Sequence, residues 1–326
     1  MQLSVLDQSP VPAGSTPAQA LHNSIELARL CDGLGYKRYW IAEHHAAGTF
    51  ASSAPEILMS RIAAETARLR IGSGATLLPY YSPLKVAESF RMLEALYPGR
   101  MDLGIGRAPG GGSLEAAALH RGERLHGDDF LEQLAQLRGF LYGDWPQGHP
   151  YADIHVAPAV DTAPEPWLLG SSPRSAQLAA QLDLPYAFAH FIFPPATREA
   201  VQTYQHYAPG RKPMVALGVV CADTEEAALE QFASTRLFGL NIAEGRRLEP
   251  VPTPAEGLAK LGPGRSEPGR PAGEWPRHIV GDPEQVRAQL LEISEALEVE
   301  ELMIWSVMHD HRARLRSYEL LGQMFA

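Results

Sequence analysis

The sequence predicts a single α/β barrel of eight parallel strands. Eight short apolar runs recur along the 326 residues, with helical patterns between them. The runs do not alternate strictly between apolar and polar residues, as expected for parallel strands that are buried on both faces. A barrel of this kind commonly needs about 250 residues plus insertions, so the length suits one domain.

The strands are expected in chain order near Leu3–Leu6, Tyr39–Ala42, Leu69–Gly72, Met101–Ile105, Trp167–Gly170, Tyr186–Ile192, Met214–Cys221 and Leu302–Val307. Alternating strands and helices indicate a parallel sheet, either closed as a barrel or open and doubly wound. The number of strands favours the closed form.

Capping signals mark the helices between the strands. Thr16-Pro17-Ala18-Gln19 combines a capping hydroxyl, a proline at the first helical position and Gln three residues after the cap. Ser53-Ala54-Pro55-Glu56 has a comparable capping box. The same cap-then-proline pattern recurs at Ser82-Pro83, Ser172-Pro173 and Asp282-Pro283.

Wider spacing after the fourth and seventh strands indicates insertions at these two places. Residues 249–278 are rich in Pro and Gly and predict a long insertion, either a lid or a disordered excursion. We therefore expect residues 1–326 to form one domain, with this insertion at about 245–278.

Composition restricts the class of protein. The net charge of −10 comes from 28 basic and 38 acidic side chains without a basic cluster, which argues against nucleic acid or membrane partners. The N-terminus lacks the pattern of a signal peptide, and no apolar run approaches the roughly 20 residues that span a bilayer. Two isolated cysteines, Cys31 and Cys221, suit a reducing compartment. These features predict a soluble cytoplasmic protein.

Polar and glycine-rich groups follow the predicted strands, where chemistry is located in barrels. They are Glu43-His44-His45, Gly72 to Thr76, Gly106-Arg107, Ser171-Ser172 and Met308 to His311. We expect them to converge on one mouth.

The stretch GIGRAPGGG (104–112) is not a dinucleotide-binding fingerprint, because Pro109 stands at the third glycine position and no helix is expected before about Asp128. Arg107 is either a phosphate partner or a surface charge. Ser172 caps a helix whose first amides could bind a phosphate, together with both hydroxyls of Ser171 and Ser172. The alternative is that Ser172 only caps the helix.

His44 is either an acid–base residue or a structural one. Adjacent strand residues point to opposite faces, so His44 and His45 do not readily chelate one metal ion, although His309 and His311 share a face. No clustered Cys/His pattern is present, and no metal is expected. The glycines in GSGATLLP (72–79) indicate either a tight turn or close approach to a large flat group.

Taken together, these residues resemble the bacterial luciferase-like family of flavin-dependent oxidoreductases. The resemblance runs from Leu3 to about Phe325. It is carried by WIAEHHAAGTFASSAPEIL (40–58), RIGSGATLLPYYSPLKVAESFRMLEALYPGRMDLGIGRAPGG (70–111), WLLGSSPRSA (167–176) and ELMIWSVMHDHRARLRSYELL (301–321). The family is a TIM barrel that binds FMN or, in some branches, the deazaflavin F420.

The resemblance implies roles for individual residues. His44 matches a catalytic histidine at the flavin, and the Gly74–Ala75 bond matches a cis peptide against the ring. Arg107 and Ser171 match phosphate-binding residues. The other cofactor-lining positions that it implies are Thr76, Gly106, Ser172, Ser9 and Trp305, with Gln8 beside them.

Two departures from the light-emitting enzymes are Gly106, where they carry a reactive cysteine, and Gly170, where they carry Glu. Light emission is therefore not expected. The resemblance implies a two-component monooxygenase that uses O2 and reduced FMN from a separate NAD(P)H-flavin reductase to oxygenate a small organic substrate. It also implies a homodimer. An F420-dependent dehydrogenase and a non-catalytic flavin-storage protein are the alternatives.

Overall fold

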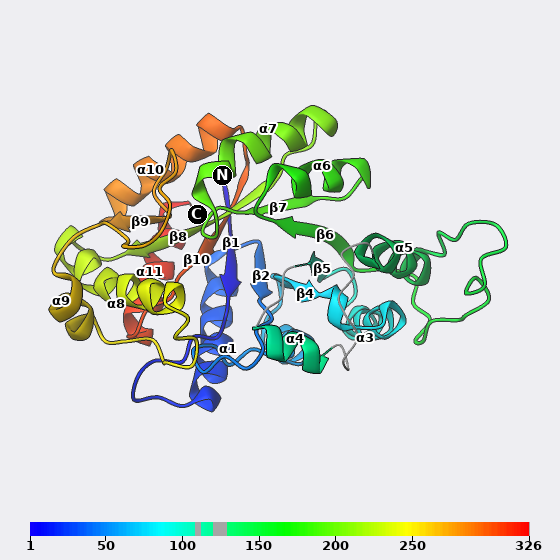
Figure 1. Ribbon diagram of the computed structural model, residues 1–326, viewed down its shortest axis with the longest axis horizontal. Coiled ribbons are helices and arrows are strands. Elements are labelled where there is room, and N and C mark those ends of the chain that lie inside the picture. The colour runs from blue at the N-terminus through cyan, green and yellow to red at the C-terminus, as the bar shows by residue number, and fades with distance from the viewer. Residues whose placement is uncertain (108–111, 120–128, 326) are drawn as a thin grey trace.

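The computed structural model describes residues 1–107, 112–119 and 129–325. Its centre is a closed barrel of parallel strands, in which β8 pairs with β10 and thereby closes the ring (Figure 1). The barrel strands are β1 (Gln2–Asp7), β2 (Arg38–Ile41), β3 (Arg70–Ser73), β5 (Met101–Gly106), β6 (Glu165–Gly170), β7 (Tyr186–Ala189), β8 (Met214–Cys221) and β10 (Glu301–Trp305). The predicted closed barrel is confirmed.

Two further strands were not predicted. β4 (Thr76–Leu77) pairs with β5, and β9 (His278–Gly281) pairs with β8 outside the ring. β4 has only two residues, too few for any periodicity to show. β9 has four residues and directly follows the Pro/Gly-rich stretch that predicted a loop.

Helices surround the ring. They are α1 (Pro17–Leu34), α2 (Pro55–Glu65), α3 (Pro83–Leu96), α4 (Ser113–Leu119), α5 (Asp129–Tyr142), α6 (Pro173–Gln181), α7 (Thr197–Tyr207), α8 (Glu225–Ala243), α9 (Pro254–Leu261), α10 (Pro283–Leu297) and α11 (His311–Met324), with 3-10 turns at Leu78–Tyr80 and Pro194–Ala196. The short helix α4 corrects the expectation that no helix begins before about Asp128. Pro109, which stands at the third glycine position of the rejected fingerprint, lies outside the described residues.

The predicted caps are only partly correct. Thr16 caps α1 as expected, whereas the Gln19 side chain donates to Asn23 instead of completing a capping box. The box expected at Ser53 is wrong: Pro55 occupies the first helical position, so Ala54 is the N-cap and offers no side-chain acceptor. Ser172 and Asp282 do form complete capping boxes, with Ser175 and Gln285.

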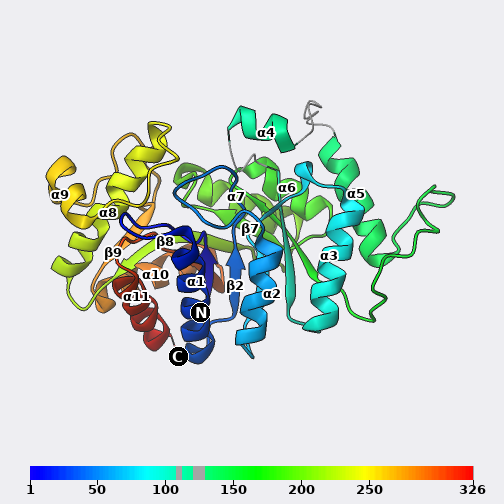
Figure 2. The same cartoon turned by 90° about the horizontal axis from the view of Figure 1, so that it is seen from below.

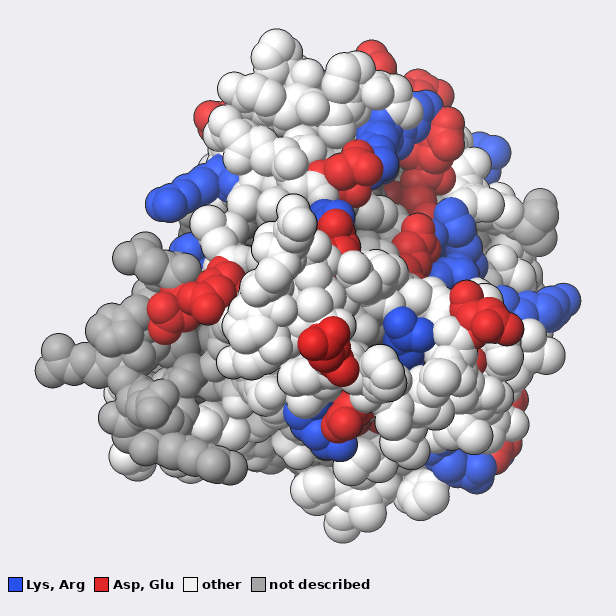
Figure 3. Space-filling view, turned by 90° about the vertical axis from the view of Figure 1, so that its right-hand side faces the viewer, with Lys and Arg blue, Asp and Glu red and all other residues white. Residues whose placement is uncertain are grey.

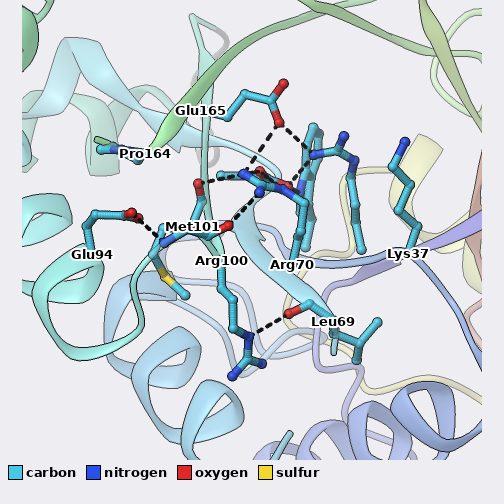
Figure 4. A network of polar contacts seen from close by, with 12 residues as sticks. Lys37, Leu69, Arg70, Glu94, Arg100, Met101, Pro164 and Glu165 are labelled. Carbon is cyan, nitrogen blue, oxygen red and sulfur yellow. Dashed lines mark hydrogen bonds and ion pairs between the residues drawn. The ribbon is translucent and has the colours of Figure 1, made fainter. Parts of the chain in front are cut away.

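A network of ion pairs and hydrogen bonds joins neighbouring strands at the amino-terminal end of the barrel (Figure 4). Buried Asp102 accepts hydrogen bonds from Arg38 Nη1, Arg70 Nε and Trp40 Nε1, each at 2.8 Å. Arg38 also contacts Glu165 and Glu301 at 3.0 Å. Because these residues begin their strands, the network lies opposite the strand ends that carry the predicted site.

The start of the insertion is packed against the mouth of the barrel. Val251 is fully buried, and its N–H donates to Val11 O while its carbonyl accepts from Ala13 N, both at 2.8 Å. Thr49 Oγ1 lies 2.8 Å from Arg247 O and 2.7 Å from Glu249 O. α9 then packs along α8. The first part of residues 249–278 is therefore packed against the barrel and α8.

Residues 143–164 form a loop that projects beyond α5, away from the barrel (Figures 1 and 2). The face that carries this loop shows acidic and basic side chains interspersed instead of a patch of one sign (Figure 3). Within the described residues, no helix is long and apolar enough to cross a membrane.

Candidate active site

The carboxyl ends of the strands surround a cavity of about 880 Å³, which we call the mouth cavity. His44 and His45 enter it from the loop after β2, Gln8 from the loop after β1, and Trp305 from the end of β10. Its other lining residues are Ala46, Ala47, Thr49, Phe50, Gly112, Ser113, Glu115, Phe191, Ile192, Phe238, Ile242, Gly245, Arg247, Leu248 and Arg270. Of the groups expected to converge at one mouth, this cavity contains His44 and His45, and Trp305, which was expected separately as a lining residue, lies in the same wall.

His44 is a neutral imidazole in this setting. Its ring packs on Phe50 with centroids 4.6 Å apart, and its Nε2 lies 3.4 Å from Gln8 Nε2. Burial, together with the nearby charges of His45 and Arg247, lowers the pKa of His44 to about 4. A neutral ring carries one donor and one acceptor nitrogen, so it can hold or receive a proton at the cavity wall.

His45 has a structural partner. Its Nε2 lies 2.6 Å from the carboxylate of Glu43, which also accepts from Tyr81 OH at 2.7 Å and from Leu77 N at 3.0 Å. Burial raises the pKa of Glu43, although these hydrogen bonds oppose the effect. Glu43 therefore ties the loop after β2 to β4 and to the turn that follows β4.

A second cavity of about 800 Å³, the Arg107 cavity, gathers the predicted phosphate residues. Arg107 reaches it from the end of β5, while Ser171 and Ser172 reach it from the end of β6. Ser172 caps α6, and Arg174 in the first turn of α6 is a second cation that the sequence analysis missed. Hydroxyls, a helix N-terminus and guanidinium groups form a donor set that fits a phosphate.

The Gly74–Ala75 peptide bond is cis, as the family resemblance implied. Around it, glycines permit close packing: a Cβ on Gly104 would lie 2.0 Å from Ser73 O, and one on Gly106 would lie 2.9 Å from Ala75 Cβ. Next to this bond, Thr76 pairs with Ile105 and Leu77 pairs with Gly106 across β4 and β5. A bulkier residue at 104 or 106 would push the 73–76 segment away from β5.

Other candidate residues are engaged elsewhere. Ser9 is fully buried, lines neither cavity, and lies 2.8 Å from Ser24 Oγ. His309 contacts Ala13 O at 3.0 Å, and His311 contacts Glu26 at 3.1 Å. Among the described residues, no group of three or more His, Cys, Asp or Glu side chains is arranged to hold a metal ion.

Several wall residues had no signal in the sequence. Phe191, Phe238, Ile242, Arg247 and Arg270 all line the mouth cavity from parts of the chain far from His44. Apolar residues in helical or strand patterns are expected in the core, and arginines in a Pro/Gly-rich insertion resemble ordinary surface charge. Only the tertiary packing assigns them to the site.

The fold and these two cavities define an eight-stranded α/β-barrel protein whose mouth offers a phosphate-binding donor set beside a largely apolar cavity. The model of one family, described as luciferase-like monooxygenase, matches residues 1–300. The chain belongs to this family.

Relatives cover almost the whole chain. It is 44% identical over 332 residues to the uncharacterized protein YwcH of Bacillus subtilis strain 168, covering 100% of this chain and 99% of that one. It is 35% identical over 327 residues to the N-acetyl-S-alkylcysteine monooxygenase of the same organism, covering 99% and 97%.

Solved structures share the fold. The crystal structure of apo-MsnO8 has a TM-score of 0.92 and 46% identity, covering 99% of this chain and 98% of that one. Two more distant structures are similar in fold alone: the FMN complex of the oxygenating constituent of 3,6-diketocamphane monooxygenase from Pseudomonas putida (TM-score 0.70, 21% identity, 99% and 97% coverage), and an F420-dependent secondary alcohol dehydrogenase (TM-score 0.70, 15% identity, 100% and 99% coverage).

Proposed function

We propose that the protein is an FMN-dependent monooxygenase of a two-component system. It would receive reduced FMN from a separate NAD(P)H-flavin reductase and use O2 to oxygenate a small organic substrate. The observation that carries this proposal is a pair of cavities lined by residues at the carboxyl ends of the barrel strands. One gathers Arg107, Ser171 and Ser172, and the other holds His44.

Each cavity has its own task. Arg107 would pair with the FMN phosphate, the Ser171 and Ser172 hydroxyls would donate to it, and the N-terminus of α6 would add its partial positive charge. Gly74, Ala75 and Gly106 line neither cavity, and the family resemblance assigns them to the wall against which a flat ring would rest. Bound reduced FMN supplies two electrons and the position at which dioxygen is activated.

His44 donates or accepts a proton beside the reacting atoms. With a pKa lowered to about 4 by burial, it is neutral at pH 7 and can donate from one nitrogen or accept at the other. Phe50, Phe238 and Trp305 surround it with apolar surface that restricts water in the cavity. An imidazolium would be disfavoured in this position.

The names of relatives favour oxygenation over hydride transfer. A relative at 35% identity is an N-acetyl-S-alkylcysteine monooxygenase, whereas the F420-dependent dehydrogenase shares only the fold at 15% identity. F420-dependent hydride transfer and flavin storage without turnover remain the two outcomes that the experiment must separate.

The test is a stopped-flow experiment on protein loaded anaerobically with reduced FMN and mixed with aerated buffer. For a monooxygenase, oxidised FMN appears later than oxygen is consumed, and the His44→Asn variant changes this delay by about tenfold or more. N-acetyl-S-benzylcysteine, chosen after the relative's name, should acquire one atom from ¹⁸O2. If reduced FMN is oxidised with the same time course when bound to the protein and when free in solution, the proposal is contradicted.

Two further arms of this experiment identify the alternatives. Reduction of F420 by a secondary alcohol, with no dependence on oxygen, would show a dehydrogenase. Stoichiometric FMN binding with no effect on its reaction with oxygen, with or without a thioether, would show a storage protein.

A further inference from the structure

Arg247 faces the mouth cavity without a counter-ion among the described residues. Its neighbour Arg246 takes both nearby carboxylates, Glu244 at 2.6 Å and Glu249 at 3.6 Å. Arg247 lines the cavity, and no ion pair or side-chain hydrogen bond joins it to the described chain. A cation held at a cavity wall with its local acids already paired is available to a ligand.

The backbone fixes Arg247 beside His44. The carbonyl of Arg247 accepts from Thr49 Oγ1 at 2.8 Å, and Thr49 belongs to the same loop as His44. A Cβ on Gly48 would lie 2.2 Å from Leu248 O, so the two segments pack as closely as a glycine allows. The Arg247 charge is also one of the causes that lower the pKa of His44.

Arg270 adds a second guanidinium to the same wall. Its Nη2 donates to Gly239 O at 3.1 Å, while its Nε is buried without a partner. Among the described lining residues, Glu115 is the one carboxylate. Two guanidinium groups against one carboxylate leave this cavity with a positive balance in a protein whose net charge is −10.

The rest of the wall is apolar. Phe50 stands 4.6 Å from the His44 ring, and Phe191 stacks on Trp305 with centroids 4.7 Å apart. Phe238 packs against both Phe50 and Trp305. An apolar interior with a cationic margin is complementary to a molecule that has an apolar body and one anionic end.

We propose that the mouth cavity selects an organic carboxylate, with Arg247 pairing with the carboxylate and Arg270 assisting it. The apolar body of the substrate then lies among Phe50, Phe238 and Trp305, next to His44. This assignment rests on the proposed function, because it gives the mouth cavity to the substrate and the Arg107 cavity to the cofactor phosphate.

A guanidinium suits this task better than a neutral donor would. It offers two parallel N–H groups to the two carboxylate oxygens, so it fixes the orientation of the substrate as well as its affinity. A neutral amide of the same shape carries no charge, so it cannot form the charge-assisted bidentate pair with the guanidinium. The cavity should therefore discriminate by charge more strongly than by size.

Isothermal titration calorimetry with 4-phenylbutyrate and 4-phenylbutanamide tests the proposal on the full chain, with and without FMN. We expect the carboxylate to bind about tenfold more tightly than the amide. The Arg247→Gln variant should bring the two affinities within about threefold by weakening only the carboxylate. Arg265→Gln, a change in the same insertion outside the cavity lining, should keep the wild-type preference.

Equal binding of acid and amide to the wild type, binding of neither, or a preference that survives Arg247→Gln would overturn the proposal. So would an Arg247→Gln variant that weakens FMN but not riboflavin, because Arg247 would then serve the cofactor phosphate. Binding is measured without turnover, so a failed oxygen experiment with an intact carboxylate preference refutes only the monooxygenase function. A successful oxygen experiment without a carboxylate preference refutes only the carboxylate site.

Discussion

Trp305 donates its indole N–H to the Oε1 of Gln8 across 2.7 Å, although 297 positions separate the two residues. An indole nitrogen only donates, so this bond fixes which end of the Gln8 amide faces Trp305. The amide NH2 group is left facing His44 Nε2 at 3.4 Å. His44 Nε2 is therefore the acceptor, and the ring proton of neutral His44 resides on Nδ1.

The Gln8→Glu variant should reverse this arrangement. A carboxylate at position 8 accepts hydrogen bonds from both Trp305 and His44, which draws a proton to Nε2 and raises the pKa of His44 from about 4 by at least ~1 unit. ¹⁵N NMR of the imidazole, followed from pH 3 to pH 8, measures both the tautomer and the pKa. Gln19→Glu, an exposed change on α1, is the control. An Nε2–H tautomer in the wild type would contradict the argument.

The Arg107→Gln variant should weaken binding of the FMN phosphate without weakening binding of the flavin ring. The variant loses a guanidinium from the Arg107 cavity, so FMN affinity should fall about tenfold or more while riboflavin affinity stays the same. Fluorescence titration of both flavins against the wild type and against Arg312→Gln, an exposed arginine outside that cavity, provides the measurement. Equal loss for FMN and riboflavin would show that Arg107 acts only on the protein structure.

Asp7→Asn should destabilise the barrel. Asp7 and Arg314 are both buried and lie 2.7 Å apart, and Asp7 also accepts from Tyr39 OH at 2.5 Å and Ser9 N at 2.9 Å. Removing the carboxylate charge leaves Arg314 buried without a counter-ion, and we expect unfolding to become easier by about 3–5 kcal/mol in urea denaturation. Asp223→Asn, at the exposed pair with Arg316, should leave the urea midpoint close to that of the wild type.

The pH dependence of the same pair has a definite sign. Burial alone would raise the pKa of Asp7, but the Arg314 charge and the hydrogen bonds lower it below its usual 3.8. The ion pair therefore stabilises the fold fully above the unfolded pKa and loses this contribution as pH falls through the folded value. The wild type and Asp7→Asn should converge in stability at the acid end of the titration.

In the His190→Gln variant, the free energy of unfolding should decrease less than in the wild type as the pH is lowered from 6.5 to 4. His190 is buried, with Nδ1 2.7 Å from Thr197 Oγ1 and Nε2 2.9 Å from Pro276 O. Burial lowers the pKa of His190 from 6.5 to about 4, so the unfolded chain binds more protons than the folded chain in this range. The free energy of unfolding therefore decreases as the pH is lowered from 6.5 to 4. Urea midpoints at half-unit steps of pH measure the slope.

The comparison at pH 8 is the internal control for His190→Gln. The imidazole is neutral in both states there, so any difference reflects only the two lost hydrogen bonds. A variant that keeps the full wild-type slope below pH 6.5 would assign the acid sensitivity to other buried groups.

Much of the fold could be predicted because burial and backbone geometry leave local marks. Strands such as β5 and β8, buried along their whole length, read as apolar runs, and Pro17, Pro173 and Pro283 stand at the first turns of their helices. The placement of Arg107 with Ser171 and Ser172 follows from the same logic, since barrel strands present their carboxyl ends together. β4 was missed because two residues are too few to show a period, and β9 was missed because it adjoins the Pro/Gly-rich stretch that predicted a loop.

The sequence by itself determined the barrel, the mouth at its strand ends, and the residues that follow each strand. Only the tertiary structure decided which distant side chains meet there. Arg247 approaches His44, Trp305 orients Gln8, and Arg314 neutralises Asp7, each across about 200 residues or more of chain. The reason is physical: strand and helix patterns record local burial and backbone preference, whereas these pairings arise from the closure of the barrel and the packing of its insertions.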